Sequence, residues 1–300
     1  MTESSGRTAT SASQRAVAPK PPRRARNWGA SAAKHALLVS TSLVLLYPLI
    51  WLVVSSFRPT NEIFLHPGLV FSDLDVSNYV RGWHALASPF ERYILNSLLI
   101  VVGAVIGNLL SCSLTAYAFA RLQFRGKRLW FAVMLSSIML PIHVVIIPQY
   151  ILFSGMGWVD TFLPLIVPKF LATDAFFIFL MVQFIRGIPV ELDEAARLDG
   201  CGHFAIFRRI ILPLMVPALA ATAIFTFIWT WNDFFSQLVY LSDQQKLTVP
   251  LALQSFMDST GTSEWGPMFA MSAVSLAPLF IVFLFGQRYL IQGISTTGGK

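Results

Sequence analysis

Apolar residues are gathered into long runs along this chain, and shorter polar segments separate the runs. A helix needs about 20 consecutive apolar residues to cross the hydrocarbon core of a bilayer. Six stretches approach that length, and the fourth is the least uniform because it contains prolines and two charged residues. The stretches are 36–56, 94–120, 129–153, 162–184, 214–232 and 267–287. This pattern predicts an all-α, polytopic membrane protein with six transmembrane helices.

The composition agrees with that class of protein. Hydrophobic residues make up 55% of the 300 residues and charged residues only 12%, whereas soluble domains carry about 25% charged residues. A chain so poor in charge cannot cover a water-facing surface. Its two cysteines, Cys112 and Cys201, form no disulfide framework, and we expect two free thiols.

Basic residues are distributed unevenly between the two sides of the predicted spans. Most of the 22 Lys and Arg residues lie in the N-terminal segment, in 121–128, in 186–209 and at the C-terminal end. Because cytoplasmic loops are enriched in Lys and Arg, we expect both termini and the segment 186–213 in the cytoplasm. The net charge of +7 is explained by this asymmetry, without a nucleic-acid partner.

The chain is expected to have two parts. Residues 1–34 are rich in Ser, Thr, Ala, Pro and Arg, which predicts a disordered, basic cytoplasmic tail. Residues 35–300 are expected to form the transmembrane domain. Its first span is too long for a cleaved signal peptide and is interpreted as an anchor that stays.

The polar segment 186–213 predicts two short helices joined by a glycine. Pro189 and the acidic residues after it suit the first turn of a helix. Gly200 is expected to end that helix in the left-handed conformation. Four residues at helical spacing share one face of the first helix: Leu192, Ala195, Ala196 and Asp199. The second helix has an apolar stripe made of Phe204, Phe207 and Ile211.

The same segment fits a long spaced pattern: Glu-Ala-Ala, three residues, Gly, nine residues, then Ile-x-Leu-Pro. The pattern resembles the cytoplasmic signature loop of permease subunits of ABC importers. Segments 183–189, 96–97, 231–235 and 287–289 extend the resemblance to the carbohydrate, MalG-like family, over residues 35–295. The residues of the loop are Glu194, Ala195, Ala196, Gly200, Ile210, Leu212 and Pro213, with Asp199 directly before the glycine.

The resemblance implies a fold, a location and a set of partners. It implies the type I (MetI-like) importer permease fold in the bacterial cytoplasmic membrane, surrounded by lipid. The implied partners are a second, MalF-like permease subunit, two ATPase subunits that bind the signature loop, and an extracytoplasmic solute-binding protein that delivers a carbohydrate. ATP and Mg²⁺ are expected in the ATPase subunits, and no cofactor is expected in this chain. Transport is expected to proceed by alternating access.

The sequence contains no recognisable catalytic constellation. The segment Gly126-Lys127-Arg128 lacks the spacing and the Ser or Thr of a P-loop. The five histidines make no paired spacing of metal ligands. We therefore expect a transport subunit that is not an enzyme, with energy supplied by a partner or an ion gradient.

Polar residues in or beside the spans are candidates for the solute path, because ionisable groups inside a membrane are costly. Asp174 is expected beyond mid-membrane toward the outside, either in the path or as a hydrogen-bond partner between helices. Lys169 is interpreted as an interfacial cation. Trp231, Asn232 and Asp233 follow the fifth span at its outer end, where they would bond sugar hydroxyls, cap the span or contact the binding protein.

Three other interpretations stay open on sequence alone. The chain would also fit an importer permease for a solute other than a sugar, a gradient-driven secondary transporter, or a membrane enzyme. A secondary transporter is expected to show paired repeats and an ion site, and it leaves the segment 186–213 without a purpose. The sequence does not name the sugar.

Overall fold

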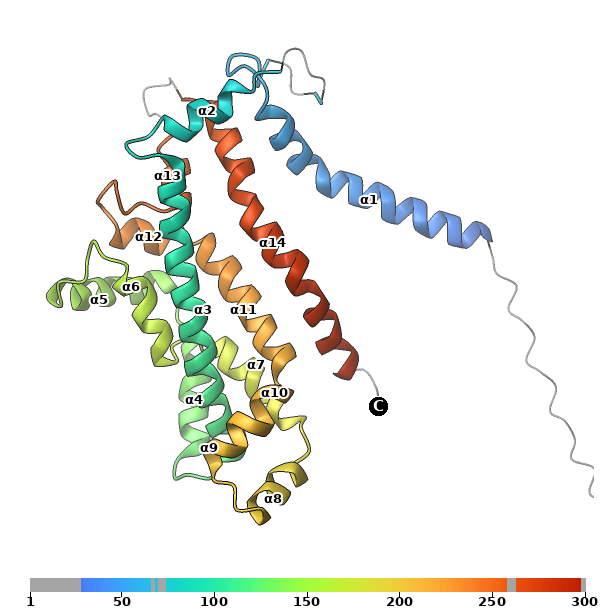
Figure 1. Ribbon diagram of the computed structural model, residues 1–300, viewed down its shortest axis with the longest axis vertical. Helices are drawn as coiled ribbons and strands as arrows, with labels where there is room; N and C mark the ends of the chain where they lie inside the picture. The colour runs from blue at the N-terminus through green and yellow to red at the C-terminus, as the bar shows by residue number, and fades with distance from the viewer. Residues whose placement is uncertain (1–27, 66–67, 70–73, 258–262, 298–300) are drawn as a thin grey trace, which may run out of the picture. The chain divides into compact units, whose positions relative to one another are not determined.

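The computed structural model of the chain describes residues 28–65, 68–69, 74–257 and 263–297. All regular elements within these ranges are helical, which confirms the predicted all-α class (Figure 1). The elements are α1 (Trp28–Ser55), α2 (Ser77–His84), α3 (Phe90–Arg121), α4 (Lys127–Ser137), α5 (Ile142–Gly155), α6 (Leu163–Ile166), η1 (Val167–Leu171), α7 (Ala175–Arg186), α8 (Glu191–Leu198), α9 (His203–Ile206), η2 (Phe207–Ile211), α10 (Leu212–Leu214), α11 (Val216–Trp231), α12 (Phe235–Tyr240), α13 (Val249–Gln254) and α14 (Trp265–Thr297).

The chain divides into two compact units, one that ends at Tyr47 and one that begins at Pro48. The first unit contains most of α1, which starts at Trp28, inside the segment expected to be a tail. The remainder of that predicted tail, 1–27, lies outside the described residues. The buried clusters, the cavity and the loops described below belong to the second unit.

Four segments of the described chain are long and apolar enough to cross a membrane without a bend of more than 40°: Ala32–Ser55, Phe90–Arg121, Leu163–Arg186 and Trp265–Tyr289. Two further pairs of segments pass the same test only if each pair counts as one bent span. These pairs are α4 with α5, bent by 101°, and His203–Leu214 with α11, bent by 75°. Counted in this way, the described residues contain the six spans predicted from the sequence.

The third span is not the continuous helix that the sequence predicted over 129–153. The chain leaves the helical path after Ser137, and α5 starts at Ile142 in a new direction. Pro141 explains the break, because proline has no N–H to donate and its ring disfavours a helical conformation of the preceding residue. The length of the apolar run therefore did not reveal the sharp bend within it.

The fourth span is interrupted as well. It begins with α6 and the 3₁₀ turn η1, and it resumes as a regular helix only at Ala175. Between them Ala172 has a left-handed backbone (φ +55°), and Asp174 occupies the N-cap position of α7. The break leaves backbone groups and the Asp174 carboxylate free to interact with neighbouring helices.

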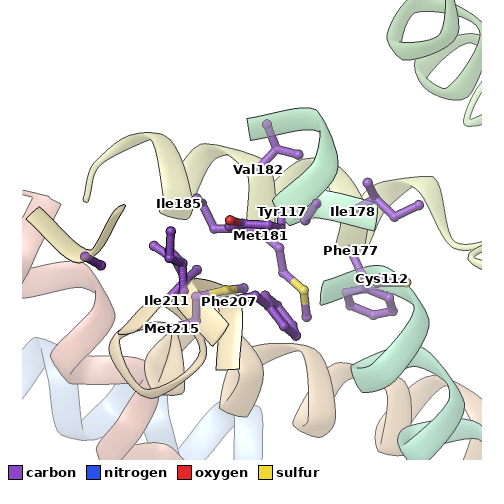
Figure 2. Packing of buried hydrophobic residues seen from close by; sticks show 13 residues of the cluster. Cys112, Tyr117, Phe177, Ile178, Met181, Val182, Ile185, Phe207, Ile211 and Met215 are labelled. Carbon is purple, nitrogen blue, oxygen red and sulfur yellow. The ribbon is translucent and has the colours of Figure 1, made fainter. Parts of the chain in front are cut away.

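Helix α3 is the central element of the second unit and packs against α7, α11 and η1 (Figure 1). Toward the α8 end of the bundle, side chains of α7 meet those of α3 and of the segment 207–215 in a buried cluster (Figure 2). Because lipid tails are as apolar as these side chains, close packing holds such helices together more than burial from water does. The labelled members are Cys112, Tyr117, Phe177, Ile178, Met181, Val182, Ile185, Phe207, Ile211 and Met215.

A second cluster lies toward the α2 end of the bundle. It joins α2 and the first turns of α3 to α11, α13 and α14. Its aromatic centre includes Phe90, Tyr93, Phe227 and Trp231. The two clusters pack against the two ends of α3.

Candidate functional site

The segment 186–213 has the helix–glycine–helix form that the sequence predicted. Gly200 follows α8 with φ +80°, a conformation that costs little only for glycine. The amide of Cys201 donates to the carbonyl of Ala196 at 2.9 Å, and the amide of Gly200 donates to the carbonyl of Arg197 at 3.0 Å. This bonding pattern is a Schellman motif. It satisfies the carbonyls at the end of α8 and turns the chain toward α9.

Helix α8 has two distinct faces. Asp193 and Ala196 are buried against the body of the protein, whereas Glu194, Ala195 and Asp199 are exposed. The structure thus turns Ala196 away from the face that it was expected to share. The outer face also carries large apolar side chains, because Leu192 is 42% exposed and Leu198 is 90% exposed. Both leucines are accessible to a partner of this loop.

The inner face of α8 is attached to the end of α3 by charge. Arg121 Nε lies 3.0 Å from Asp193 Oδ2, and both side chains are almost completely buried. Arg121 Nη2 also donates to the carbonyl of Ile188 at 2.7 Å. One turn earlier on α3, the ring of Tyr117 contacts the ring of Phe207 at 5.3 Å. These contacts could not be predicted, because nothing in the sequence pairs residues so far apart.

The second short helix is divided into α9, the π-helical turn η2 and α10. Ile210 and Leu212 are partly buried against the cluster of Figure 2, and Pro213 is exposed in the first turn of α10. Phe207 and Ile211 of the predicted stripe are buried. Phe204, in the first turn of α9, contacts the ring of Phe207 at 6.4 Å but is 68% exposed.

A polar node links four elements in the middle of the bundle. Asp174 Oδ2 accepts hydrogen bonds from Asn108 Nδ2 of α3 at 2.5 Å and from Lys169 Nζ of η1 at 2.9 Å. The same Asn108 amide donates to Thr226 Oγ1 of α11 at 3.1 Å. Asp174 is therefore a hydrogen-bond partner between helices, one of its two expected roles. Lys169 is its ion-pair partner and not simply an interfacial cation.

An open cavity of about 870 Å³ lies beside this node. Its size falls within the range of small-molecule sites. Lys169 and Asp174 line it together with Asp233. Further polar lining comes from Thr115 and Gln149. The aromatic lining is Phe119, Phe124, Trp130 and Tyr240. The mixture of carboxylate, amide, hydroxyl and aromatic groups suits a polar, hydrogen-bonding solute.

The three candidate residues at the end of α11 have three different environments. Trp231 is buried in the second cluster and stacks on Phe227 at 5.8 Å, so the structure places it in the core. Asn232 is exposed and donates to the carbonyl of its own helix at Ile228. Asp233 accepts the amide of Ser236, which caps α12, and also lines the cavity. Only Asp233 of the three reaches the cavity that Asp174 lines.

A further polar cluster, not predicted from the sequence, joins two loops near α6 and α12. Asp160 Oδ1 accepts the amides of Ser242 and Asp243. Lys246 Nζ donates to Asp160 Oδ2 at 3.1 Å and forms an ion pair with Asp243 Oδ2 at 3.4 Å. The two backbone amides hold the pKa of Asp160 below its ordinary value. The hydrogen bond to Asp160 raises the pKa of Lys246. We call this cluster the loop clasp.

Six apolar spans, a polar cavity along them and a two-helix loop with an exposed face define a membrane transport subunit. Residues 100–296 match the family described as binding-protein-dependent transport system inner membrane component, and the chain belongs to this family. It is therefore a multi-pass inner-membrane permease, and the expectation of a transport subunit that is not an enzyme is confirmed.

Characterised relatives align with nearly the whole chain. The diacetylchitobiose uptake system permease protein NgcG of Streptomyces coelicolor is 31% identical over 266 residues, which cover 88% of this chain and 87% of that protein. The trehalose/maltose transport system permease protein MalG of Thermococcus litoralis is 32% identical over 254 residues, or 85% of this chain and 91% of that protein.

A solved structure supports the fold. A chain of a bacterial ABC transporter involved in the import of the acidic polysaccharide alginate superposes with a TM-score of 0.77. The match covers 90% of this chain and all of that chain, at 24% sequence identity. The predicted type I importer permease fold is confirmed.

Proposed function

We propose that this chain is one of two permease subunits of an ATP-driven, binding-protein-dependent sugar importer. The named relatives take up diacetylchitobiose and trehalose or maltose, which supports a carbohydrate substrate. The other parts are a second permease, two ATPase subunits and an extracytoplasmic solute-binding protein. ATP and Mg²⁺ belong to the ATPase subunits.

The observation that carries this proposal is the two-faced helix α8. Its inner face is fixed to the body of the permease, while its outer face presents Glu194, Ala195 and Asp199 beside exposed leucines. Such a surface suits a protein partner, with an apolar centre and a charged rim. We assign the outer face of α8, and the elbow at Gly200, to the ATPase subunit. Ile210, Leu212 and Pro213 serve to hold the second short helix in place.

The cavity beside the polar node is proposed as this subunit's share of the sugar path. Sugars offer many hydroxyls, and Asp174, Asp233 and Gln149 offer matching acceptors and donors along the cavity. Tyr240 and Trp130 add aromatic surfaces of the kind on which sugar rings stack. Asn232, on the exposed end of α11, is assigned to contacts outside the path, with the binding protein.

The Lys and Arg distribution supports an orientation with the α8 end in the cytoplasm. Both termini then also lie in the cytoplasm. The loop clasp and α2 lie at the outer side, where the binding protein docks. Movement of α8 on ATP binding would reorient the spans from inward-facing to outward-facing, which is alternating access.

Reconstitution tests the proposal. The chain is co-purified with the second permease, the ATPase and the binding protein, and placed in vesicles that contain ATP. A ligand screen on the binding protein identifies the solute, and we expect a sugar whose uptake requires ATP. Uptake that follows an ion gradient without ATP would contradict the importer mechanism, and a binding protein that binds only amino acids or ions would contradict the sugar.

A variant separates the role of the loop from that of the whole complex. Glu194→Lys reverses the charge on the outer face of α8, and we expect it to reduce ATPase association while the permease remains in the membrane. Arg125→Gln removes an exposed charge from a neighbouring loop and serves as the control. Normal ATPase association in both variants would contradict the assignment of this face.

A further inference from the structure

The buried attachment between α3 and α8 uses one charged residue from each helix. Arg121 is the last residue of α3, and Asp193 lies in the first turn of α8. Their side chains are only 6% and 3% exposed, with Nε and Oδ2 3.0 Å apart. Since Arg121 also binds the carbonyl of Ile188, one guanidinium holds both the approach to α8 and its first turn.

The contact between the two charges is close but incomplete. Among the described residues, Arg121 Nε and both carboxylate oxygens of Asp193 lack a hydrogen-bond partner. The atoms are near enough for an ion pair, but they are not aligned for a hydrogen bond. A buried charge without hydrogen bonds is costly. The energy of this pair therefore depends steeply on the exact position of α8.

The two neighbouring acidic residues of α8 lie on different faces of the helix. Glu194 is exposed on the outer face, whereas Asp193 is buried on the inner face. A partner that holds the outer face must move Asp193 together with it. Asp193 then acts on the end of α3, a helix of 32 residues whose middle carries Asn108 of the polar node. A rigid helix of this length connects α8 to the wall of the cavity.

We propose that Arg121 and Asp193 are the positioning pair through which α8 passes its movement to α3 and thus to the cavity. The inference rests on the proposed function, because α8 is displaced only if an ATPase subunit binds it. In one state of the transport cycle the guanidinium of Arg121 and the carboxylate of Asp193 become aligned for a hydrogen bond, and in the other state this alignment is lost. Neither residue touches the solute or ATP. Their role is to convert movement of the loop into movement of a span.

The test measures uptake and ATP hydrolysis in the same vesicles. Asp193→Asn removes the charge, and the double variant Arg121→Met/Asp193→Leu replaces the pair by apolar side chains of similar size, a change that folded proteins often tolerate. We expect both to retain the ATPase subunit and to hydrolyse ATP. Uptake per ATP should fall about tenfold, within the usual range of coupling between sites. Asp193→Glu should recover most of the coupling, and Arg125→Gln should match the wild type.

Two results would overturn the inference. If the double apolar variant transports as much solute per ATP as the wild type, packing alone connects α8 to α3. If that variant accumulates in the membrane but no longer binds the ATPase, the pair only maintains the shape of α8. A wild-type complex that shows no ATP-dependent uptake would instead contradict the proposed function, and this outcome is visible before any variant is made.

Discussion

Lys169 and Asp174 form an ion pair across the break in the fourth span, with Nζ and Oδ2 2.9 Å apart. The two side chains are 28% and 26% exposed, and both line the open cavity. Asp174 also accepts the amide of Asn108, so a single carboxylate oxygen links η1 and α7 to α3. The pair therefore has a structural role between helices and a position from which it meets the solute.

Removal of the Asp174 carboxylate should weaken both roles. Asp174→Ala removes the acceptor of the Lys169 ammonium and one of the two acceptors of the Asn108 amide. A hydrogen bond to a charged group contributes about 1.5–3 kcal/mol. We expect a lower unfolding temperature of the purified complex and reduced uptake, with the ATPase still bound. Lys169→Met/Asp174→Leu should recover stability but not uptake. Unchanged stability and uptake in Asp174→Ala would show that the carboxylate contributes neither to helix packing nor to the solute path.

The two glycines after α8 offer a matched comparison of backbone strain. A Cβ at Gly200 or at Gly202 meets nothing within 4 Å, but only Gly200 has a positive φ, at +80°. A left-handed conformation costs a residue with a Cβ about 1–2 kcal/mol. Gly200→Ala should therefore destabilise the loop and weaken ATPase association, whereas Gly202→Ala should be nearly neutral. Equal ATPase affinity in the two variants, measured by titration, would count against the strained elbow.

Close packing of α3 against η1 depends on Gly107. A Cβ at this position would lie 2.8 Å from Phe170 Cδ2 and 3.0 Å from the carbonyl carbon of Lys169. Overpacking of this kind costs about 1–3 kcal/mol, so Gly107→Ala should lower the unfolding temperature in detergent. Gly155→Ala is the control, because its Cβ would meet nothing within 4 Å. A Gly107→Ala protein as stable as the control would show that η1 moves freely away from α3.

The loop clasp should depend on pH only at the extremes. Asp160 has a lowered pKa in the folded protein. Its contribution to stability is therefore fully present above the pKa of the unfolded state, about 3.9. This contribution is lost as the pH falls through the lower pKa of the folded state. Lys246 has a raised pKa. Its contribution to stability is therefore fully present below the pKa of the unfolded state and is lost as the pH rises through the higher pKa of the folded state. The clasp should stay closed across the neutral range.

Hydrogen exchange of the segment 240–247, corrected for the intrinsic effect of pH, measures this clasp. We expect the amides of Ser242 and Asp243 to lose protection only below about pH 4, near the ordinary pKa of Asp. Asp160→Asn keeps an acceptor and tolerates the left-handed φ of +61°, but it should abolish the acid transition. An acid transition that survives in this variant would assign the titration to another group, with Asp243 the first to test.

Much of the fold could be predicted from the sequence because the signals were local. Short-range patterns predicted most of the elements: apolar runs of membrane length, Gly200 after a short acidic helix, and the spacing of Ile210, Leu212 and Pro213. The bend at Pro141 had a local signal too, since proline opposes a helix. It was missed because the apolar run continues on both sides of it.

The residues that organise the site could not be predicted, because their partners are distant in sequence. Asn108 and Asp174 are 66 positions apart, and Arg121 and Asp193 are 72 apart. Periodicity placed Leu192, Ala195, Ala196 and Asp199 on one face, but it does not say which residues face the protein. That depends on where α3 ends. Trp231 stacks on Phe227 one turn away, but the burial of this pair depends on helices that are distant in sequence.

The short helix α4 has a consequence for how this protein is assembled in the cell. Its 11 residues extend only about 16 Å at 1.5 Å per residue, roughly half of the 30 Å hydrocarbon layer. The chain then passes through a turn in which Met139 and Leu140 are exposed. Irregular backbone at membrane depth is tolerated only where protein or water covers it. Under the proposed function the second permease would cover this turn, so the lifetime of a newly inserted copy of this subunit in the membrane should depend on how quickly that second permease is made.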